Sequence, residues 1–284
     1  MNRRIFIKEN LLLASGIFLS DMLFSQDIQS KRFHVFHTND MHSRVEAFPL
    51  SHSKYPGMGG MVNLSGKLNK LRKSYPDYLL LDSGDFLQGT PYFNEFGGKV
   101  EVEMMNMMGY DFVTLGNHEF DNGEEALADL LSLAKFKVIC ANYDFSNSPL
   151  AQLVSNEPAV VARMIGRRLF RIGIIGVGVD LNGLAIPKNR KGVVCNEPIA
   201  VANKQAAFLA NEQNCDLVIV LSHLGYQHDI LLAKESKNID MILGGHSHTV
   251  LSKPTLVQNL LNKDVVVNQM GRDALYLGHL VWEI

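Results

Sequence analysis

Carboxylate, imidazole and amide side chains recur in five short polar clusters, each at a point where an apolar run breaks. In chain order the clusters are Asp40–His42, Gly84–Asp85, Gly116–Glu119, Ser222–His223 and Gly244–His248. These side-chain types are the ligands that transition-metal cations accept, and a pair of such cations can hydrolyse a phosphate ester. The combination of all five clusters therefore predicts a two-metal hydrolytic site.

The elements between the clusters alternate between strand-like and helix-like patterns. Short apolar or β-branched runs predict strands at Phe33–His37, Tyr78–Leu81, Phe112–Leu115, Val138–Ala141, Leu217–Leu221, Met241–Leu243, Val265–Asn268 and Leu277–Trp282. Helical spacing predicts helices at Met61–Ser74, Val100–Met108, Glu124–Lys135, Ile199–Gln213 and Asp229–Glu235. Such alternation is typical of an α/β fold with a largely parallel sheet.

Two further segments refine this architecture. Val161–Ile165 and Leu169–Gly176 flank Gly166-Arg167-Arg168, which predicts a hairpin and hence a mixed sheet. Residues 179–196, which contain two glycines, a proline and three cationic side chains, predict a long surface loop. Ligands of open α/β sheets bind beyond the carboxyl ends of strands, where all five clusters fall, so the predicted location and the predicted chemistry agree.

The five clusters also carry a resemblance to a known family. His37–His42, Gly84–Asp85, Gly116–Asp121, Ser222–Gly225 and Gly245–His248 resemble the motifs of the calcineurin-like metallophosphoesterases. Their order and spacing are similar to those of the catalytic domain of bacterial periplasmic 5′-nucleotidases. The resemblance implies a sandwich of mixed β-sheets flanked by helices, in a single catalytic domain over residues 31–284.

The resemblance further implies a role for each candidate ligand. Asp40, His42 and His248 match the ligands of the first metal, and Asn117, His223 and His246 match those of the second. Asp85 matches the carboxylate that bridges the two. Some nucleotidases have glutamine at the position of His248, a difference that we expect to tune metal preference. The mixed nitrogen and oxygen ligands fit zinc, manganese or iron, among which the sequence does not choose.

Charge and proton transfer support phosphate chemistry at such a site. Two divalent cations and the two aspartates leave a charge of about +2, which would attract phosphate and lower the pKa of a coordinated water. His118 follows the ligand Asn117, and Asp121 is placed three residues on to hydrogen-bond its ring. The family uses this His–Asp pair to stabilise the transition state or protonate the leaving oxygen, and we assign the same role here.

Other polar residues near the motifs have plainer interpretations. Glu119 has the chemistry of a ligand, but the family pattern does not use it. Asp82 is either a hydrogen-bonding group behind the ligands or part of a turn. The histidines that receive no ligand or catalytic role are interpreted as structural or solvated; they are His34, His37, His52, His228 and His279.

Composition excludes several classes of protein. The 284 residues are 46% apolar and 20% charged with a formal charge of −2, so no basic surface for a nucleic-acid polymer is predicted. Three distant cysteines exclude a disulfide framework. Residues 1–26 predict an export signal, because Arg3, Arg4 and Lys8 precede an apolar run too short to span a bilayer. Asn2–Lys8 resembles the twin-arginine pattern, with an ordinary signal as the alternative, and no stable membrane anchor is expected.

The sequence therefore predicts a periplasmic or secreted two-metal phosphoesterase acting on small phosphorylated substrates, with 5′-nucleotides as the leading class. The chain stops where the resemblance places the end of the catalytic domain, so we expect the C-terminal specificity domain of nucleotidases to be absent. The alternatives are a 2′,3′-cyclic-nucleotide phosphodiesterase or nucleotide-sugar pyrophosphatase, the catalytic subunit of a split nucleotidase with a separate base-binding chain, and a non-catalytic metal-binding scaffold.

Overall fold

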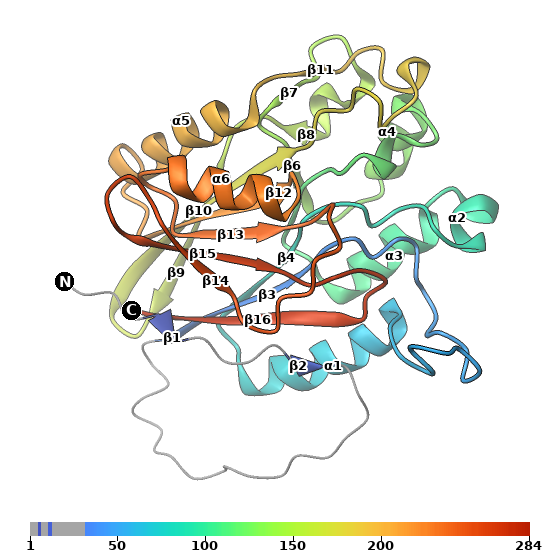
Figure 1. Cartoon of the computed structure of the whole chain (residues 1–284), viewed down its shortest axis with the longest axis horizontal. Coiled ribbons are helices and arrows are strands. Elements are labelled where there is room, and N and C mark those ends of the chain that lie inside the picture. Colours follow the sequence, from blue (N-terminus) through green and yellow to red (C-terminus); the bar gives the residue numbers. More distant parts are fainter. Residues whose placement is uncertain (1–4, 7–10, 13–31) are drawn as a thin grey trace.

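Two β-sheets pack face to face, and helices cover the outer face of each (Figure 1). The computed structural model describes residues 5–6, 11–12 and 32–284. The predicted export signal over residues 1–26 lies outside the described residues, apart from two short strands that pair with the last strand of the chain. Within the described part of the chain, no helix has both the length and the apolar character needed to cross a membrane.

The first sheet has the order β1-β16-β3-β4-β5-β6-β8, and β2 also pairs with β16. Its strands are β1 (Ile5–Phe6), β2 (Leu11–Leu12), β3 (Arg32–Thr38), β4 (Tyr78–Asp82), β5 (Phe112–Val113), β6 (Lys137–Ile139), β8 (Val154–Ser155) and β16 (Tyr276–Glu283). The strands from β3 to β8 run parallel along the sheet, whereas β16 is antiparallel to β3.

The second sheet has the order β14-β15-β13-β12-β10-β9. Its strands are β9 (Ala159–Ile165), β10 (Arg168–Gly178), β12 (Leu217–His223), β13 (Met241–Gly244), β14 (Thr255–Gln258) and β15 (Asp264–Gln269). The central strands β10, β12, β13 and β15 are parallel, and β9 and β14 are antiparallel edge strands. A separate ribbon pairs β7 (Tyr143–Asp144) with β11 (Val194–Cys195).

Helices complete a four-layer arrangement. They are α1 (Met61–Ser74), α2 (Pro91–Phe96), α3 (Lys99–Met108), α4 (Glu124–Leu131), α5 (Pro198–Asn211) and α6 (Tyr226–Glu235), with short 3₁₀ turns η2 (His118–Phe120), η3 (Pro149–Gln152) and η4 (Pro187–Asn189). Apolar residues of α1, α3 and α4 pack on the first sheet, and those of α5 and α6 pack on the second.

The alternation of side chains in β3 explains why the layers form. Phe33 and Val35 join a buried cluster between the two sheets that includes Ile172 and Ile219 of the second sheet. Phe36 belongs instead to the cluster beneath the helices on the other side. Both faces of the strand are therefore apolar, as expected for a sheet that is covered twice.

The strand β12 contributes to the same layer from the opposite sheet. Its alternate residues Leu217, Ile219 and Leu221 all belong to the cluster between the sheets, together with Leu79 and Leu81 of β4. One continuous apolar layer thus joins the two sheets. This layer fixes the carboxyl ends of both sets of parallel strands relative to one another.

The predicted α/β class, the mixed sheets and the hairpin at β9–β10 are confirmed, but several element bounds differ from the predictions. The strand predicted at Phe112–Leu115 has only two residues, and the helix predicted at Glu124–Lys135 ends at Leu131. Just beyond that end, the Ser132 hydroxyl donates to the carbonyl of Asp129, a local bond that competes with the helix. The loop predicted over residues 179–196 contains η4 and β11.

Candidate metal centre

The five polar clusters all lie at the carboxyl ends of parallel strands. Asp40 follows β3, Asp85 follows β4 and Asn117 follows β5 in the first sheet, while His223 ends β12 and His246 follows β13 in the second. A hydrogen bond joins the two sheets at this edge, since the hydroxyl of Ser83 donates to the carbonyl of Leu243 at 2.7 Å. The site therefore forms where both sheets end together.

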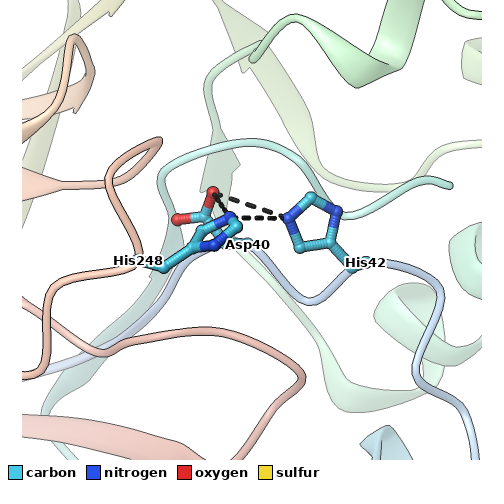
Figure 2. Close-up of side chains that lie close together, drawn as sticks. All are labelled: Asp40, His42 and His248. Atoms are coloured by element: carbon cyan, nitrogen blue, oxygen red, sulfur yellow. Dashed lines mark hydrogen bonds and ion pairs between the residues drawn. The ribbon is translucent and has the colours of Figure 1, made fainter. Parts of the chain in front are cut away.

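The structure brings the candidate ligands into two groups. Nitrogen and carboxylate oxygen atoms of Asp40, His42 and His248 all lie within 4.8 Å of one another, and Figure 2 shows these three side chains pointing toward a common point. The same limit holds for Asp85, His223 and His246. Asp85 also forms such a group with His42 and His118, so its carboxylate lies between the two sets of ligands.

Asn117 completes the second group. Its Oδ1 lies 3.1 Å from Nδ1 of His246. All seven predicted ligands are therefore neighbours at one edge of the fold, although their assignment as ligands stays a prediction.

The backbone at these positions is unusual. Positive φ angles occur at five of the seven candidate ligands, which are Asp40 (50°), His42 (48°), Asp85 (56°), His246 (69°) and His248 (52°). Left-handed conformations cost residues other than glycine about 1–3 kcal/mol each and concentrate at functional sites. The loops therefore place these side chains toward the site at a cost in conformational free energy.

The orientation of two imidazole rings fits a bound cation. Nδ1 of His223 lies 2.7 Å from the carbonyl oxygen of Ser83, and Nδ1 of His42 lies 3.3 Å from that of Gln88. A carbonyl can only accept, so each Nδ1 carries a proton, and in the neutral ring each Nε2 presents a lone pair to the site. Histidines that bind metals usually donate their other N–H in this way.

The contact between His223 and Asp85 is the strongest test of this fit. Nε2 of His223 is completely buried and makes no hydrogen bond, although it lies 3.0 Å from Oδ2 of Asp85. Two buried acceptors that face each other need a positive charge between them. A cation bound by both atoms would supply it, so these residues fit a metal.

Without a cation, a proton takes that place. Burial lowers the pKa of His223, but the carboxylate of Asp85 outweighs burial and raises that pKa to about 10. Burial opposes ionisation of Asp85, yet His223 holds the pKa of this carboxyl below its ordinary value. Burial also lowers the pKa values of His42 and His246, which favours the neutral imidazole that binds metals.

Gly116 keeps the space between Asp85 and His223 open. A Cβ atom at this position would overlap Oδ1 of Asp85 and lie 2.6 Å from Nε2 of His223. Gly84 has a different role. Its Cβ would lie 2.6 Å from the backbone nitrogen of Gly116, so glycine there lets two ligand loops approach each other.

His118 and Asp121 form the predicted pair at the rim of the site. Nδ1 of His118 lies 2.8 Å from Oδ2 of Asp121, and both side chains are about one-third exposed. This hydrogen bond raises the pKa of His118 to about 9, with burial opposing it and the charge of Asp85 adding to it. The imidazole is therefore protonated near neutral pH. The amide nitrogen of His118 also donates to Oδ1 of Asp85 at 2.9 Å, which ties the pair to the centre.

Glu119 has a role that the sequence did not reveal. Its buried carboxylate accepts hydrogen bonds from the backbone nitrogens of Asp85 (2.9 Å), Phe86 (3.0 Å), Leu87 (3.3 Å) and Gly116 (2.6 Å). It thus joins the loop that carries Asp85 to the loop that carries Asn117. The only sequence clue is a carboxylate inside a ligand motif without a ligand role.

Asn39 orients Asp40 in a similar way. Its Nδ2 donates to Oδ2 of Asp40 at 2.6 Å and to the carbonyl of Gly271 at 2.8 Å, while its Oδ1 accepts from the backbone nitrogen of Met270. The side chain therefore connects this candidate ligand to the loop that follows β15.

Asp82, which the sequence left between two interpretations, lies behind the ligands. Its carboxylate accepts from the hydroxyl of Thr38 at 2.6 Å and from the backbone nitrogen of Gly84 at 2.9 Å. Asp82 therefore supports the turn that leads to Asp85.

Histidines outside the motifs make contacts within the fold. His34 and His279 contact each other through Nδ1 and Nε2 at 2.9 Å. His37 is fully buried with Nε2 3.0 Å from Nδ2 of Asn268, and burial lowers its pKa to about 3. These contacts agree with the structural role expected for the three residues.

Comparisons with known proteins agree with this arrangement. The family model for calcineurin-like phosphoesterases matches residues 33–250. The chain is 35% identical over 267 residues to the 5′-nucleotidase of Bos taurus, a match that covers 87% of this chain and 45% of the bovine protein. It is 29% identical over 272 residues to the trifunctional nucleotide phosphoesterase protein YfkN of Bacillus subtilis, covering 87% and 18%.

A solved structure gives the same result. The 5′-nucleotidase precursor from Thermus thermophilus superposes with a TM-score of 0.79 at 34% identity, covering 88% of this chain and 51% of that one. The chain thus spans about half, or less, of the length of the relatives it matches.

Proposed function

The chain belongs to the calcineurin-like phosphoesterase family, and on that premise we propose that it hydrolyses phosphate monoesters, with 5′-nucleotides as the leading substrates. One observation carries the proposal. The carboxylate of Asp85 lies within 4.8 Å of imidazole nitrogens from both groups of candidate ligands, which is the place of a ligand shared by two cations.

In this proposal Asp40, His42 and His248 hold one divalent cation, and Asn117, His223 and His246 hold the other. Asp85 contributes to both. Nitrogen and oxygen donors of this kind suit zinc, manganese or iron. When bound, the two cations would supply Lewis acidity that polarises the phosphoryl group and lowers the pKa of a coordinated water.

The charge of the ligand set supports a phosphate substrate. Asp40 and Asp85 contribute two negative charges against four positive charges from two divalent cations, and the other proposed ligands are neutral. The remaining charge of about +2 favours a phosphate dianion. His42 and His223, whose Nδ1 atoms are engaged by backbone carbonyls, would hold the cations through the lone pairs of Nε2.

His118 supplies a proton to the leaving group in this proposal. The hydrogen bond from Nδ1 to Asp121 fixes the ring and favours its protonated form, so Nε2 carries the proton that can be transferred. The alkoxide of a nucleoside is a poor leaving group, and protonation of its oxygen as the P–O bond breaks avoids that charge. Asp121 is in turn held by η4, since the side-chain amide of Asn189 donates to its backbone carbonyl oxygen at 2.7 Å.

The choice of nucleotides rests on the relatives. The bovine and Thermus proteins are named 5′-nucleotidases, and the Bacillus protein is named a nucleotide phosphoesterase.

Export to the periplasm or the cell exterior and a separate base-binding partner remain predictions from the sequence. We propose export because the apolar segment over residues 11–19 has the character of a signal.

A substrate screen on metal-reconstituted protein tests the proposed activity. Chelated protein is supplied with Mn²⁺ or Zn²⁺, the bound metal is quantified, and release of phosphate is measured from AMP, p-nitrophenyl phosphate, 2′,3′-cyclic AMP and UDP-glucose, with a coupled phosphatase for the last two. We expect AMP to give the highest kcat/KM. Protein that binds two cations and cleaves none of these compounds would contradict the proposal, and cleavage of the cyclic or sugar compounds alone would select the alternative enzymes.

A further inference from the structure

A pocket of about 430 Å³ opens directly beside the candidate metal centre. His248 lines the pocket and is also one of the candidate ligands of the centre. The remaining walls come from the loop between β3 and α1 and from the segment around the start of β16. They include Phe48, His52, Lys54, Tyr55, Arg272 and Tyr276. This volume is in the range of pockets that bind small organic ligands.

Aromatic rings dominate one wall. The ring centroids of Phe48 and His52 are 4.4 Å apart, and the rings of His52 and Tyr55 are nearly parallel, at 10° and 6.0 Å. The guanidinium of Arg44 lies 4.2 Å from the centroid of Phe48. Tyr276 adds a further ring from β16. Flat aromatic walls of this kind stack on planar heterocycles.

The aromatic loop is held in place by its own hydrogen bonds. The backbone nitrogen of Phe48 donates to the carbonyl of Met58 at 2.8 Å, and that of Gly57 donates back to the carbonyl of Phe48 at 3.0 Å. Nδ1 of His52 accepts from the backbone nitrogen of Tyr55 at 3.0 Å, so its Nε2 carries a proton that can be donated to a ligand. The pocket is therefore preorganised, with a polar group among its rings.

The floor of the pocket is joined to the metal centre through the backbone. The nitrogen of Asp273 donates to the carbonyl of Asp40 at 2.8 Å, and its carbonyl accepts from the nitrogen of Gly60 at 3.1 Å. Lys54 and Arg272 supply two positive charges to the lining against one negative charge from Asp273. The pocket is thus continuous with the centre.

We propose that this pocket is a base-binding subsite, in which the heterocycle of a nucleotide stacks on the aromatic loop while its phosphate lies at the metal centre. The inference rests on the proposed function, because it names the part of the substrate beyond the phosphate. It assigns base recognition to residues of this domain, and Tyr55, whose ring also lies 5.0 Å from the ammonium of Lys54, is one of the rings of the aromatic wall.

Two substrates that differ only in the base test the proposal. AMP and ribose 5-phosphate share the phosphate and the sugar, so the ratio of their kcat/KM values measures what the base contributes. In Tyr55→Leu we expect kcat/KM for AMP to fall about tenfold, the effect of losing one base–aromatic stack, while that for ribose 5-phosphate changes less than about twofold. Tyr55→Phe keeps the ring and should keep the ratio.

Phe96→Leu is the matched control, because Phe96 is an aromatic residue of α2 that is 52% exposed and does not line the pocket. It should leave both substrates unaffected. An unchanged ratio in Tyr55→Leu, an equal loss for both substrates, or the same loss in Phe96→Leu would each overturn the assignment.

A binding measurement separates this inference from the proposed activity. Adenosine, which has no phosphate, is titrated into chelated protein and followed by ligand-observed NMR, with ribose as the negative control. Weaker adenosine binding in Tyr55→Leu than in the parent protein supports the subsite even if no phosphate ester is hydrolysed. Adenosine binding that is equal in both proteins, or no stronger than that of ribose, overturns it whatever the activity.

Discussion

Glu119 joins the loops that carry Asp85 and Asn117, and replacing its carboxylate with an amide should weaken both the fold and the metal centre. Each oxygen of the carboxylate accepts two backbone N–H groups, with Asp85 and Gly116 on Oε2 and two further nitrogens on Oε1. In Glu119→Gln one of these oxygens becomes an NH₂ group. Two buried N–H donors then face another donor.

The expected cost follows from that count. A buried donor without an acceptor costs about 1–3 kcal/mol, so two of them should lower the free energy of unfolding by about 2–6 kcal/mol. Glu124→Gln is a matched control. Glu124 is also buried, but only its Oε1 accepts a hydrogen bond, from the nitrogen of Gly192 at 2.9 Å, and Oε2 has no partner. The amide can occupy the position of Oε2, and the cost should stay below about 1 kcal/mol.

Urea unfolding in the presence of a chelator measures both costs, with linear extrapolation to water. The experiment is done at pH 9, because burial and the charge of Asp85 raise the pKa of Glu119 to about 8. Metal titration should show an affinity about 10–100-fold lower in Glu119→Gln, as is common when groups that orient ligands are removed. Equal destabilisation by the two substitutions, with metal affinity retained in Glu119→Gln, would refute the reasoning.

Further predictions concern the metal centre and one buried histidine. Asp85→Asn should lose both cations by metal analysis, whereas His118→Gln should keep them and lower kcat about 10²–10⁴-fold; equal metal loss would contradict the assigned roles. Adding Mn²⁺ to chelated protein at about 100 times its dissociation constant should stabilise it by about 2.7 kcal/mol per cation, seen as a higher Tm. Burial lowers the pKa of His37 from 6.5 to about 3, so only the unfolded chain binds that proton between these values. Stability should therefore fall by up to about 1.4 kcal/mol per pH unit as the pH drops below the unfolded pKa, and His37→Gln should flatten this slope in urea titrations.

Long elements with strong periodicity were predictable from the sequence. The helix Met61–Ser74 was predicted with the observed bounds, and the strand predicted at Leu217–Leu221 lies within β12. The short elements α2, β7, β11 and β14 were not predicted. The strands β7 and β11 have two residues each, which is too few for a periodic pattern. They also pair across about fifty residues of sequence, so neither segment predicts the pairing by itself.

The candidate site was predictable in its residues but not in its supports. Cation ligands are recognisable by type, because few side chains supply imidazole or carboxylate donors, and their place at strand ends followed from the α/β pattern. The contacts of Glu119 and Asn39 were not predictable. Both side chains bind backbone groups of distant loops. Nearly every residue carries the same backbone groups, so the sequence does not show which of them a side chain will bind.

These supports and the left-handed backbone of the ligands belong to one physical arrangement. Five candidate ligands in left-handed conformations and a buried His223–Asp85 contact both favour other arrangements of the loops when no cation is bound. The hydrogen bonds of Glu119 and Asn39 oppose that tendency from outside the ligand set, and they do so whether or not a cation is present. These hydrogen bonds therefore hold the loops in place without a contribution from a bound cation.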